Sequence, residues 1–166
     1  MVTAAVSPEA SAVWAVLRAV PDPEIPVLSL WDLGVIREVS VQGRDVVVGI
    51  TPTYTGCPAT AVIKSDVAEA LQQAGYMAQV HDVLSPPWSS AWITPEGCEK
   101  LRAYGIAPPE FPVGRVAALL GEEVTPACPR CASRQTELLS EFGSTPCKAL
   151  HRCCACQEPF DRFKCI

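Results

Sequence analysis

The chain has 166 residues, 49% of them hydrophobic, and a formal net charge of −5 at pH 7. This length allows one ordinary hydrophobic core and a small additional domain. The acidic excess lies in residues 1–121, which carry 7 Lys/Arg and 12 Asp/Glu, whereas residues 122–166 carry 6 of each. Neither part has the basic footprint of a nucleic-acid binder, so we expect no nucleic-acid partner.

The cysteines indicate a compartment. Seven of the nine lie between Cys128 and Cys165, and only Cys57 and Cys98 lie upstream. A secreted disulfide framework normally has an even number of cysteines spread across the fold. Residues 1–13 lack the pattern of a signal peptide, and no run of about 18 apolar residues predicts a membrane span. We therefore expect a cytoplasmic protein whose thiolates bind metal.

The first part of the chain predicts a small α/β unit. Ser7 followed by Pro8 is typical of a helix start, and the prolines of residues 21–26 end that helix. Gly56-Cys57-Pro58 opens a second helix, which ends at Gly75. Strands are expected over residues 35–41, 46–51 and 76–84. The buried face of the second helix is expected to comprise Ile63, Val67, Ala70, Leu71 and Ala74.

A proline- and tryptophan-rich bridge follows, over residues 86–124. Thr94 is expected to cap one short helix within it, with Pro95 at its first position and Gly105 at its end. Two interpretations of the aromatic residues here remain open. They pack the bridge onto the first domain, or they expose a patch for a protein partner. These residues are Trp88, Trp92 and Phe111.

Two cysteine pairs near the end of the chain carry the strongest motif. Cys128 and Cys131 form one C-x-x-C pair, and Cys153 and Cys156 form another, with 21 residues between the pairs. This spacing is typical of a four-thiolate zinc ribbon, and four thiolates leave no open position for catalysis. We expect one structural zinc per chain. Iron in a rubredoxin-like site has the same ligands and stays an alternative.

The remaining thiols of this region have no fixed role in the pattern. Cys147 and Cys165 are small buried or oxidation-prone residues, or they form an auxiliary metal-handling or redox pair. Cys154 does not give the C-x-x-C spacing to Cys156, and His151 is taken as a loop or supporting residue. We expect residues 125–166 to form the ribbon and the bound metal to supply much of its folding free energy.

Three motifs in the first 85 residues resemble a known family. Their order and spacing are similar to those of the iron–sulfur cluster assembly domain, as found in SufT-like and eukaryotic cytosolic assembly proteins. The resemblance implies an α+β fold, with a small N-terminal α/β domain (residues 1–85) before the C-terminal β-rich ribbon. The motifs are Asp22-Pro23-Glu24-Ile25-Pro26, Asp32-Leu33-Gly34-Val35-Ile36 and Thr51-Pro52-Thr53-Tyr54-Thr55-Gly56-Cys57-Pro58.

The last part of the chain resembles a narrower group, the accessory proteins of phenylacetate degradation. The similarity is carried by residues 141–150 and residues 158–166. It implies partners among the oxygenase or reductase subunits of the multicomponent phenylacetyl-CoA epoxidase. It also implies a role in maturing or maintaining the iron centres of that enzyme, through a transient iron–sulfur cluster or iron.

Cys57 is the candidate residue for such a transfer. Because Pro58 is a natural first helical residue, Cys57 is expected at the N-cap, where free backbone N–H groups favour a thiolate. A small buried apolar role is the alternative. One thiol cannot hold a cluster, which usually has four protein ligands, so a second subunit or a transient role is needed. A homodimer is one such arrangement.

The carboxylates of the first motif have two interpretations. Asp22 and Glu24, with Asp32 and Thr51, could surround a pocket near Cys57 and orient a metal. More often, acids in such turns satisfy backbone donors.

Two functions of different classes are therefore expected. The first is a non-catalytic maturation factor for the epoxidase, and the alternative is a structural or regulatory subunit that docks through its ribbon. A stand-alone enzyme has less support, because the chain offers no complete acid–base or nucleophile–base set.

Overall fold

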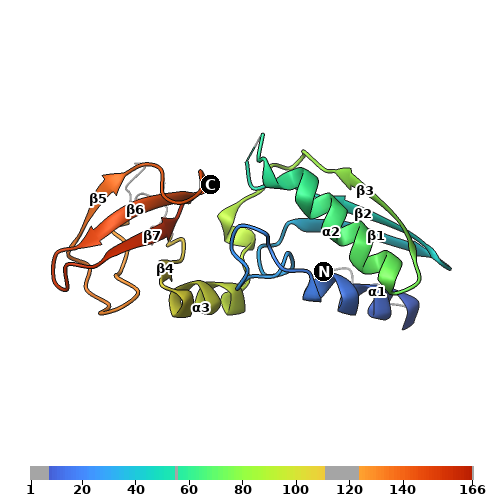
Figure 1. Cartoon of the computed structure of the whole chain (residues 1–166), viewed down its shortest axis with the longest axis horizontal. Helices are drawn as coiled ribbons and strands as arrows, with labels where there is room; N and C mark the ends of the chain where they lie inside the picture. Colours follow the sequence, from blue (N-terminus) through green and yellow to red (C-terminus); the bar gives the residue numbers. More distant parts are fainter. Residues whose placement is uncertain (1–7, 55, 111–123, 166) are drawn as a thin grey trace. The chain divides into compact units, whose positions relative to one another are not determined.

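The computed structural model describes residues 8–54, 56–110 and 124–165. The chain divides into two compact units, residues 1–88 and residues 89–166, and each is described by itself (Figure 1). The expected α+β class is confirmed, with a mixed first unit and a β-rich end. None of the helices in the described ranges has the length and apolar character needed to traverse a bilayer.

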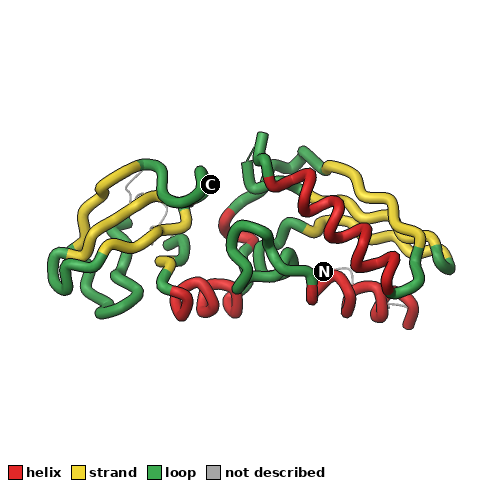
Figure 2. The backbone as a smooth tube through the Cα atoms, viewed as in Figure 1, coloured by secondary structure: helices red, strands yellow, loops and turns green. Residues whose placement is uncertain are grey.

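The first unit combines a three-stranded sheet with two helices (Figure 2). β1 and β2 are antiparallel neighbours, and β2 and β3 are parallel, so α2 is the crossover between them. Gly43 has a φ of 61° in the tight turn between the first two strands, a conformation that glycine adopts without steric cost. The elements are α1 (Pro8–Ala19), β1 (Ile36–Gln42), β2 (Asp45–Ile50), α2 (Ala59–Gln73) and β3 (Met77–Asp82).

The core of this unit lies between the helices and one face of the sheet. Alternate residues of β2 are buried on that face, whereas Val47 on the other face is 38% exposed. Successive strand residues point to opposite faces, so this pattern shows that one face of the sheet is covered. The two helices lie on that covered face. The buried side chains that the helices and β2 contribute are Val13, Leu17, Val46, Val48, Ile50, Ile63, Val67 and Leu71.

The segment between α1 and β1 has no long regular element, yet it is well buried. Leu28, Leu30 and Leu33 are each at most 2% exposed. The indole N–H of Trp88 donates to the backbone carbonyl of Leu33 over 2.9 Å, and Trp88 is itself 4% exposed. Trp88 therefore packs within the first unit.

Two local expectations differ from the structure. The helix α2 is assigned from Ala59, which makes Pro58 its N-cap in place of Cys57, although Pro58 has the helical φ and ψ of a first helical residue and makes no side-chain cap bond. Ala74 is exposed and Ala70 is half-buried, so the buried face of α2 is narrower than expected. Ser7, Thr55 and Phe111 lie outside the described residues.

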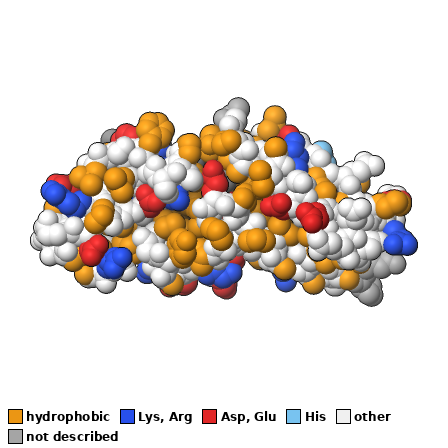
Figure 3. Space-filling view, in the orientation of Figure 1, with side chains coloured by type: hydrophobic (Ala, Val, Ile, Leu, Met, Phe, Trp, Pro, Cys, Tyr) orange, Lys and Arg blue, Asp and Glu red, His pale blue; other side chains and the backbone are white. Residues whose placement is uncertain are grey.

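The second unit is a four-stranded sheet preceded by one helix. The strand order is β4-β7-β6-β5, with β4 and β7 parallel and the other pairs antiparallel. On the face shown in Figure 3, Lys and Arg side chains are separated and form no continuous stripe over the residues the structure describes. The elements are a 3-10 helix η1 (Ser90–Trp92), α3 (Pro95–Tyr104), β4 (Ile106–Ala107), β5 (Thr136–Ser140), β6 (Lys148–Cys153) and β7 (Pro159–Phe163).

The helix α3 has the ends that the sequence predicts. The Thr94 hydroxyl accepts from the Gly97 N–H, Pro95 is the first helical residue, and Gly105 adopts a φ of 94° after the last turn. The strand β4 begins directly after Gly105, so the end of α3 places Ala107 in the sheet. Ala107 is buried in one cluster with Cys128, Cys153 and Phe160.

Candidate functional site

Four cysteine sulfurs gather at one end of the second unit. The Sγ atoms of Cys128, Cys131, Cys153 and Cys156 all lie within 4.8 Å of one another. The Cys128–Cys156 and Cys131–Cys153 sulfurs are 3.8 and 3.5 Å apart. A tetrahedral zinc with Zn–S bonds of about 2.3 Å separates its sulfurs by about 3.8 Å. The residues present therefore fit the metal that the spacing predicts.

The two knuckles share one backbone design. In each, the N–H of the first cysteine donates to the carbonyl five residues later, and its own carbonyl accepts from the N–H four residues later. The residue after the second cysteine is left-handed in both, with φ of 60° at Ala132 and 64° at Gln157. The pairs are Cys128 to Ser133 and Ala132 to Cys128 in the first knuckle, and Cys153 to Glu158 and Gln157 to Cys153 in the second.

The knuckles set different protonation preferences. The backbone N–H of Cys156, with that of Ala155, lowers the pKa of the Cys153 thiol from 9.0 to about 6. At Cys131 the Ser133 backbone favours the thiolate, but the hydrogen bond with Cys153 and desolvation outweigh it and raise the pKa to about 12. Metal binding needs thiolates, so these N–H groups favour the liganding form at Cys153.

The four thiols form a closed structural site, because they fill every coordination position of a tetrahedral ion. Cys128 and Cys153 are buried, and Cys131 is exposed. Four thiolates would hold the ion completely, and zinc has no redox chemistry of its own. Among the described residues this is the one cluster of metal-binding side chains. We therefore assign Cys128, Cys131, Cys153 and Cys156 to a stabilising metal, for which zinc fits.

Cys57 lies at a different kind of place, in the first unit. It is half-buried in the loop that leads from the end of β2 to the start of α2. Its N–H donates to the Tyr54 carbonyl over 3.3 Å and its carbonyl accepts from Thr60 over 3.2 Å. Because β2 and β3 are parallel, this loop leaves the carboxyl edge of the pair, where open α/β sheets bind ligands.

Thr51 and the carboxylates have defined structural partners. The Thr51 hydroxyl donates to the Val83 carbonyl over 2.7 Å and ties the ends of β2 and β3 together. The Asp22 carboxylate accepts from the N–H groups of Glu24 and Ile25 at 2.9 and 2.7 Å. Asp32 accepts in the same way from the backbone and hydroxyl of Ser29. These contacts match the turn interpretation of the acids, and Glu24 is half-buried beside Asp22.

The surplus thiols have separate surroundings. Cys147 is buried, with its Sγ 3.0 Å from the Thr145 hydroxyl. Cys165 is exposed, and its thiol donates to the Glu110 carbonyl over 3.3 Å. Cys154 is exposed between the ligands of the second knuckle. The auxiliary role of Cys147 and Cys165 stays a hypothesis.

His151 belongs to β6 rather than to a loop. It is 5% exposed and stacks on the Phe160 ring of β7, with ring centroids 5.8 Å apart.

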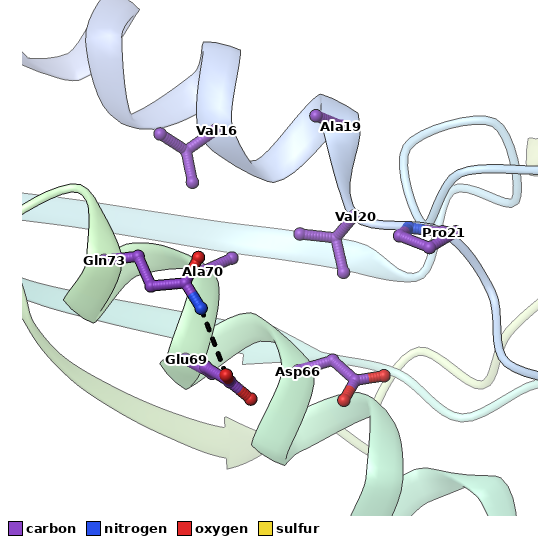
Figure 4. A pocket seen from close by; sticks show the side chains of 8 residues that line it. All are labelled: Val16, Ala19, Val20, Pro21, Asp66, Glu69, Ala70 and Gln73. Carbon is purple, nitrogen blue, oxygen red and sulfur yellow. Dashed lines mark hydrogen bonds between the residues drawn. The ribbon is translucent and has the colours of Figure 1, made fainter.

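A groove between α1 and α2 is a further feature of the first unit (Figure 4). Its volume is about 480 Å³, and Val16 of α1 and Val20, just after the end of α1, face Ala70 of α2 across it. Two carboxylates, Asp66 and Glu69, stand on the α2 side, and the Gln73 amide donates to Glu69 over 3.0 Å. None of the residues predicted as site residues lines it.

Sequence reasoning missed the residues that brace the first knuckle. Arg134, Glu110 and Thr136 contact the segment that leads into Cys128. Ala132 in the left-handed region was equally unforeseen, because no glycine or asparagine marks that position. One signal in the sequence could have indicated this role. Arg134 lies three residues after the liganding Cys131, close enough to contact the same knuckle.

Comparisons with known proteins identify both parts of the chain. Residues 10–81 match the family model of the iron–sulfur cluster assembly protein, and residues 114–164 match the PaaD zinc beta ribbon domain. A protein of Escherichia coli strain K12, described as one of the subunits of a 1,2-phenylacetyl-CoA epoxidase, is 51% identical over 161 residues. The alignment covers 96% of this chain and 94% of that protein.

The chain belongs to the PaaD family. Its first unit is also similar to a crystal structure of a DUF59 domain of unknown function from Bacillus anthracis. The TM-score is 0.51 at 29% identity, and the match covers 55% of this chain and 89% of that one. A conserved hypothetical protein from Thermotoga maritima matches at 29% identity with a TM-score of 0.46, over 55% of this chain and 91% of that one. Family membership confirms the resemblances found in both halves of the sequence.

Proposed function

We propose that this protein helps to assemble or maintain the iron–sulfur and di-iron centres of a phenylacetyl-CoA epoxidase, without catalysing the epoxidation. The observation that carries the proposal is one chain with two family domains. An iron–sulfur cluster assembly domain precedes a PaaD zinc ribbon, and 96% of the chain aligns with a relative described as part of an epoxidase. The cargo would be iron or a cluster, and the client would be an oxygenase or reductase subunit in the cytoplasm.

Cys57 is the residue we assign to the cargo. It is a half-buried free thiol at the carboxyl edge of a parallel strand pair, in a loop that Thr51 anchors. Asp22 and Glu24 belong to the turn after α1, where Asp22 accepts backbone hydrogen bonds. We propose that these two acids support the fold of the first unit and do not bind the cargo. Since one thiol provides one of the usual four ligands of a cluster, the other ligands must come from a second copy of the chain or from the client.

A deletion strain tests the maturation role. Epoxidase purified from a strain without this protein is expected to contain little iron, and chemical reconstitution with iron and sulfide is expected to restore its activity. Complementation with Cys57→Ser is expected to leave the epoxidase iron-poor although the variant folds. Fully iron-loaded epoxidase from the deletion strain would refute the proposal.

The second candidate is a structural or regulatory subunit, and it is favoured by the relative from Escherichia coli, which is named as part of the epoxidase itself. It predicts that iron-replete epoxidase still requires stoichiometric amounts of this protein for activity. Anaerobic purification with metal analysis adds an independent measurement. One zinc per chain without iron favours an adaptor, whereas substoichiometric iron and sulfide that disappear in Cys57→Ser favour a cluster carrier.

A further inference from the structure

The two knuckles are held by different means, although their backbone designs match. The second knuckle is the tip of a β-hairpin, because β6 ends at Cys153, β7 starts at Pro159, and Arg152 pairs with Pro159. The ladder between the two strands has five residue pairs in all. The first knuckle has a strand on its exit side only, since residues 124–128 belong to no strand. Its entry must therefore be fixed in another way.

Three side chains take the place of the missing strand. One guanidinium nitrogen of Arg134 donates to the Thr125 carbonyl over 2.9 Å, and the other lies 2.8 Å from the Glu110 carboxylate. The Thr136 hydroxyl donates to the Pro126 carbonyl over 3.0 Å. The second Glu110 oxygen is 3.5 Å from the Ala127 N–H, a contact at the long limit of a hydrogen bond.

This arrangement joins the two ends of the knuckle. Arg134 follows Ser133, whose carbonyl accepts from the Cys128 N–H, and it reaches back to the residues just before Cys128. A guanidinium can do this because its planar fork bonds to two acceptors in fixed directions. Glu110 is the better shielded partner, with a side chain 25% exposed, compared with 59% for Arg134.

We propose that Arg134, oriented by Glu110, is the positioning residue that closes the first knuckle and limits the rate at which the ribbon loses its metal. Cys131 and Cys156 are both exposed, so exposure does not separate the two knuckles. Exchange would begin at the first knuckle because no strand holds its entry, while the β6–β7 ladder keeps the second knuckle formed. Supporting contacts around metal ligands typically change metal affinity by about 10- to 100-fold when removed. The inference concerns the ribbon alone and does not depend on the maturation role.

The chain offers a matched control. Arg152 and Glu137 form an ion pair across β5 and β6, beside the second knuckle, with side chains 47% and 45% exposed. It has the same chemistry, but the backbone ladder already closes the knuckle there. Arg152→Gln therefore removes an equivalent ion pair without removing the closure.

The experiment measures zinc release from the purified full chain to a chromogenic chelator. Arg134→Gln is expected to release zinc about tenfold faster than the wild-type protein. Glu110→Gln is expected to fall between them, and Arg152→Gln to stay within about twofold of wild type because the β6–β7 ladder already closes the second knuckle. Equal rates for Arg134→Gln and Arg152→Gln would overturn the proposal.

Amide hydrogen exchange separates positioning from general loss of stability. In zinc-loaded Arg134→Gln, the Cys128 and Ala132 N–H groups should exchange faster, while those of Cys153 and Gln157 keep wild-type protection. Equal loss of protection in both knuckles would also overturn the proposal. If Arg134→Gln does not fold, Arg134→Lys gives the same comparison, because it keeps the charge and loses the fork.

Discussion

Ala132 and Gln157 occupy the same backbone position in the two knuckles, one residue after the second cysteine, with φ of 60° and 64°. Neither is a glycine, although residues with a Cβ atom rarely adopt this region. The positive φ turns the chain so that each N–H bonds back to the first cysteine carbonyl, at 2.9 Å from Ala132 and 2.8 Å from Gln157. Each knuckle therefore holds one residue in a backbone conformation that costs free energy, and closure of the knuckle offsets that cost.

This relationship predicts that Ala132→Gly stabilises the zinc-loaded ribbon. Glycine removes the Cβ conflict and retains the backbone hydrogen bond, for a net gain of about 0.5–1 kcal/mol after its larger unfolded-state entropy. Denaturant unfolding of zinc-loaded protein measures the change. Gln157→Gly should gain less, because it also loses the amide hydrogen bond to the Cys154 carbonyl. A lower stability of Ala132→Gly would contradict the interpretation.

Loss of one ligand should unfold the ribbon and leave the first unit intact. Cys131→Ser removes a thiolate from a ribbon whose core cluster itself contains the ligands Cys128 and Cys153. We expect loss of the bound metal and of the amide signals of β5 to β7, with those of α2 unchanged. Cys154→Ser is the matched control, because this exposed thiol belongs to the same knuckle as Cys153 and is outside the sulfur cluster. A metal-free Cys154→Ser variant would count against the four-ligand assignment.

The lowered pKa of Cys153 gives metal loading a specific pH dependence. With a folded-state pKa of about 6, below the ordinary 9.0, the Cys153 thiolate stabilises the folded second knuckle above pH 9. This contribution decreases from pH 9 downward and is lost as the pH falls through 6. Zinc that binds to a chain whose second knuckle is already formed should therefore release fewer than four protons per ion at pH 7.5.

Calorimetry in buffers of different ionisation enthalpy counts these protons. The number released should rise as the pH is lowered through 6. Release of four protons at pH 7.5 would show that the Cys153 thiol is not deprotonated in the metal-free chain.

Removal of the Trp88 hydrogen bond should destabilise the first unit. Trp88→Phe leaves the Leu33 carbonyl, in a residue 2% exposed, without its 2.9 Å donor, at a cost of about 1–3 kcal/mol. Thermal unfolding followed by circular dichroism measures it. Trp31→Phe is the comparison, since Trp31 is 37% exposed and a phenyl ring can still contact Trp14. Equal melting temperatures of the two variants would contradict the burial argument.

Features set by neighbouring residues were predictable from the sequence. The caps of α3 at Thr94 and Gly105 follow from local hydrogen bonds and φ preferences, and the structure confirms both. The sulfur cluster was predictable because two C-x-x-C pairs at this separation have the ligand spacing of a four-thiolate zinc ribbon. The assigned start of α2 differs by one residue from the prediction, since proline has no N–H to join the helix hydrogen bonds although Pro58 has helical dihedral angles.

Features set by distant residues were not predictable. The pairing of β4 with β7 joins residues more than fifty positions apart, and a strand of two residues has no periodic pattern. The fork of Arg134 was hidden for the same reason, because its acceptors lie on Thr125 and Glu110. The left-handed φ of Ala132 is imposed by closure of the knuckle and is unrelated to alanine's own preference.

The short strand β4 has a consequence for any attempt to study the ribbon apart from the rest of the chain. A fragment that starts at residue 125 would lack Ala107 in the core cluster and would leave the hydrogen-bonding edge of β7 bare. Bare strand edges recruit other chains, so such a fragment should self-associate. A fragment that starts at residue 89 would carry its own edge protection. The boundary suggested by the cysteine motif is therefore too short for a monomeric ribbon.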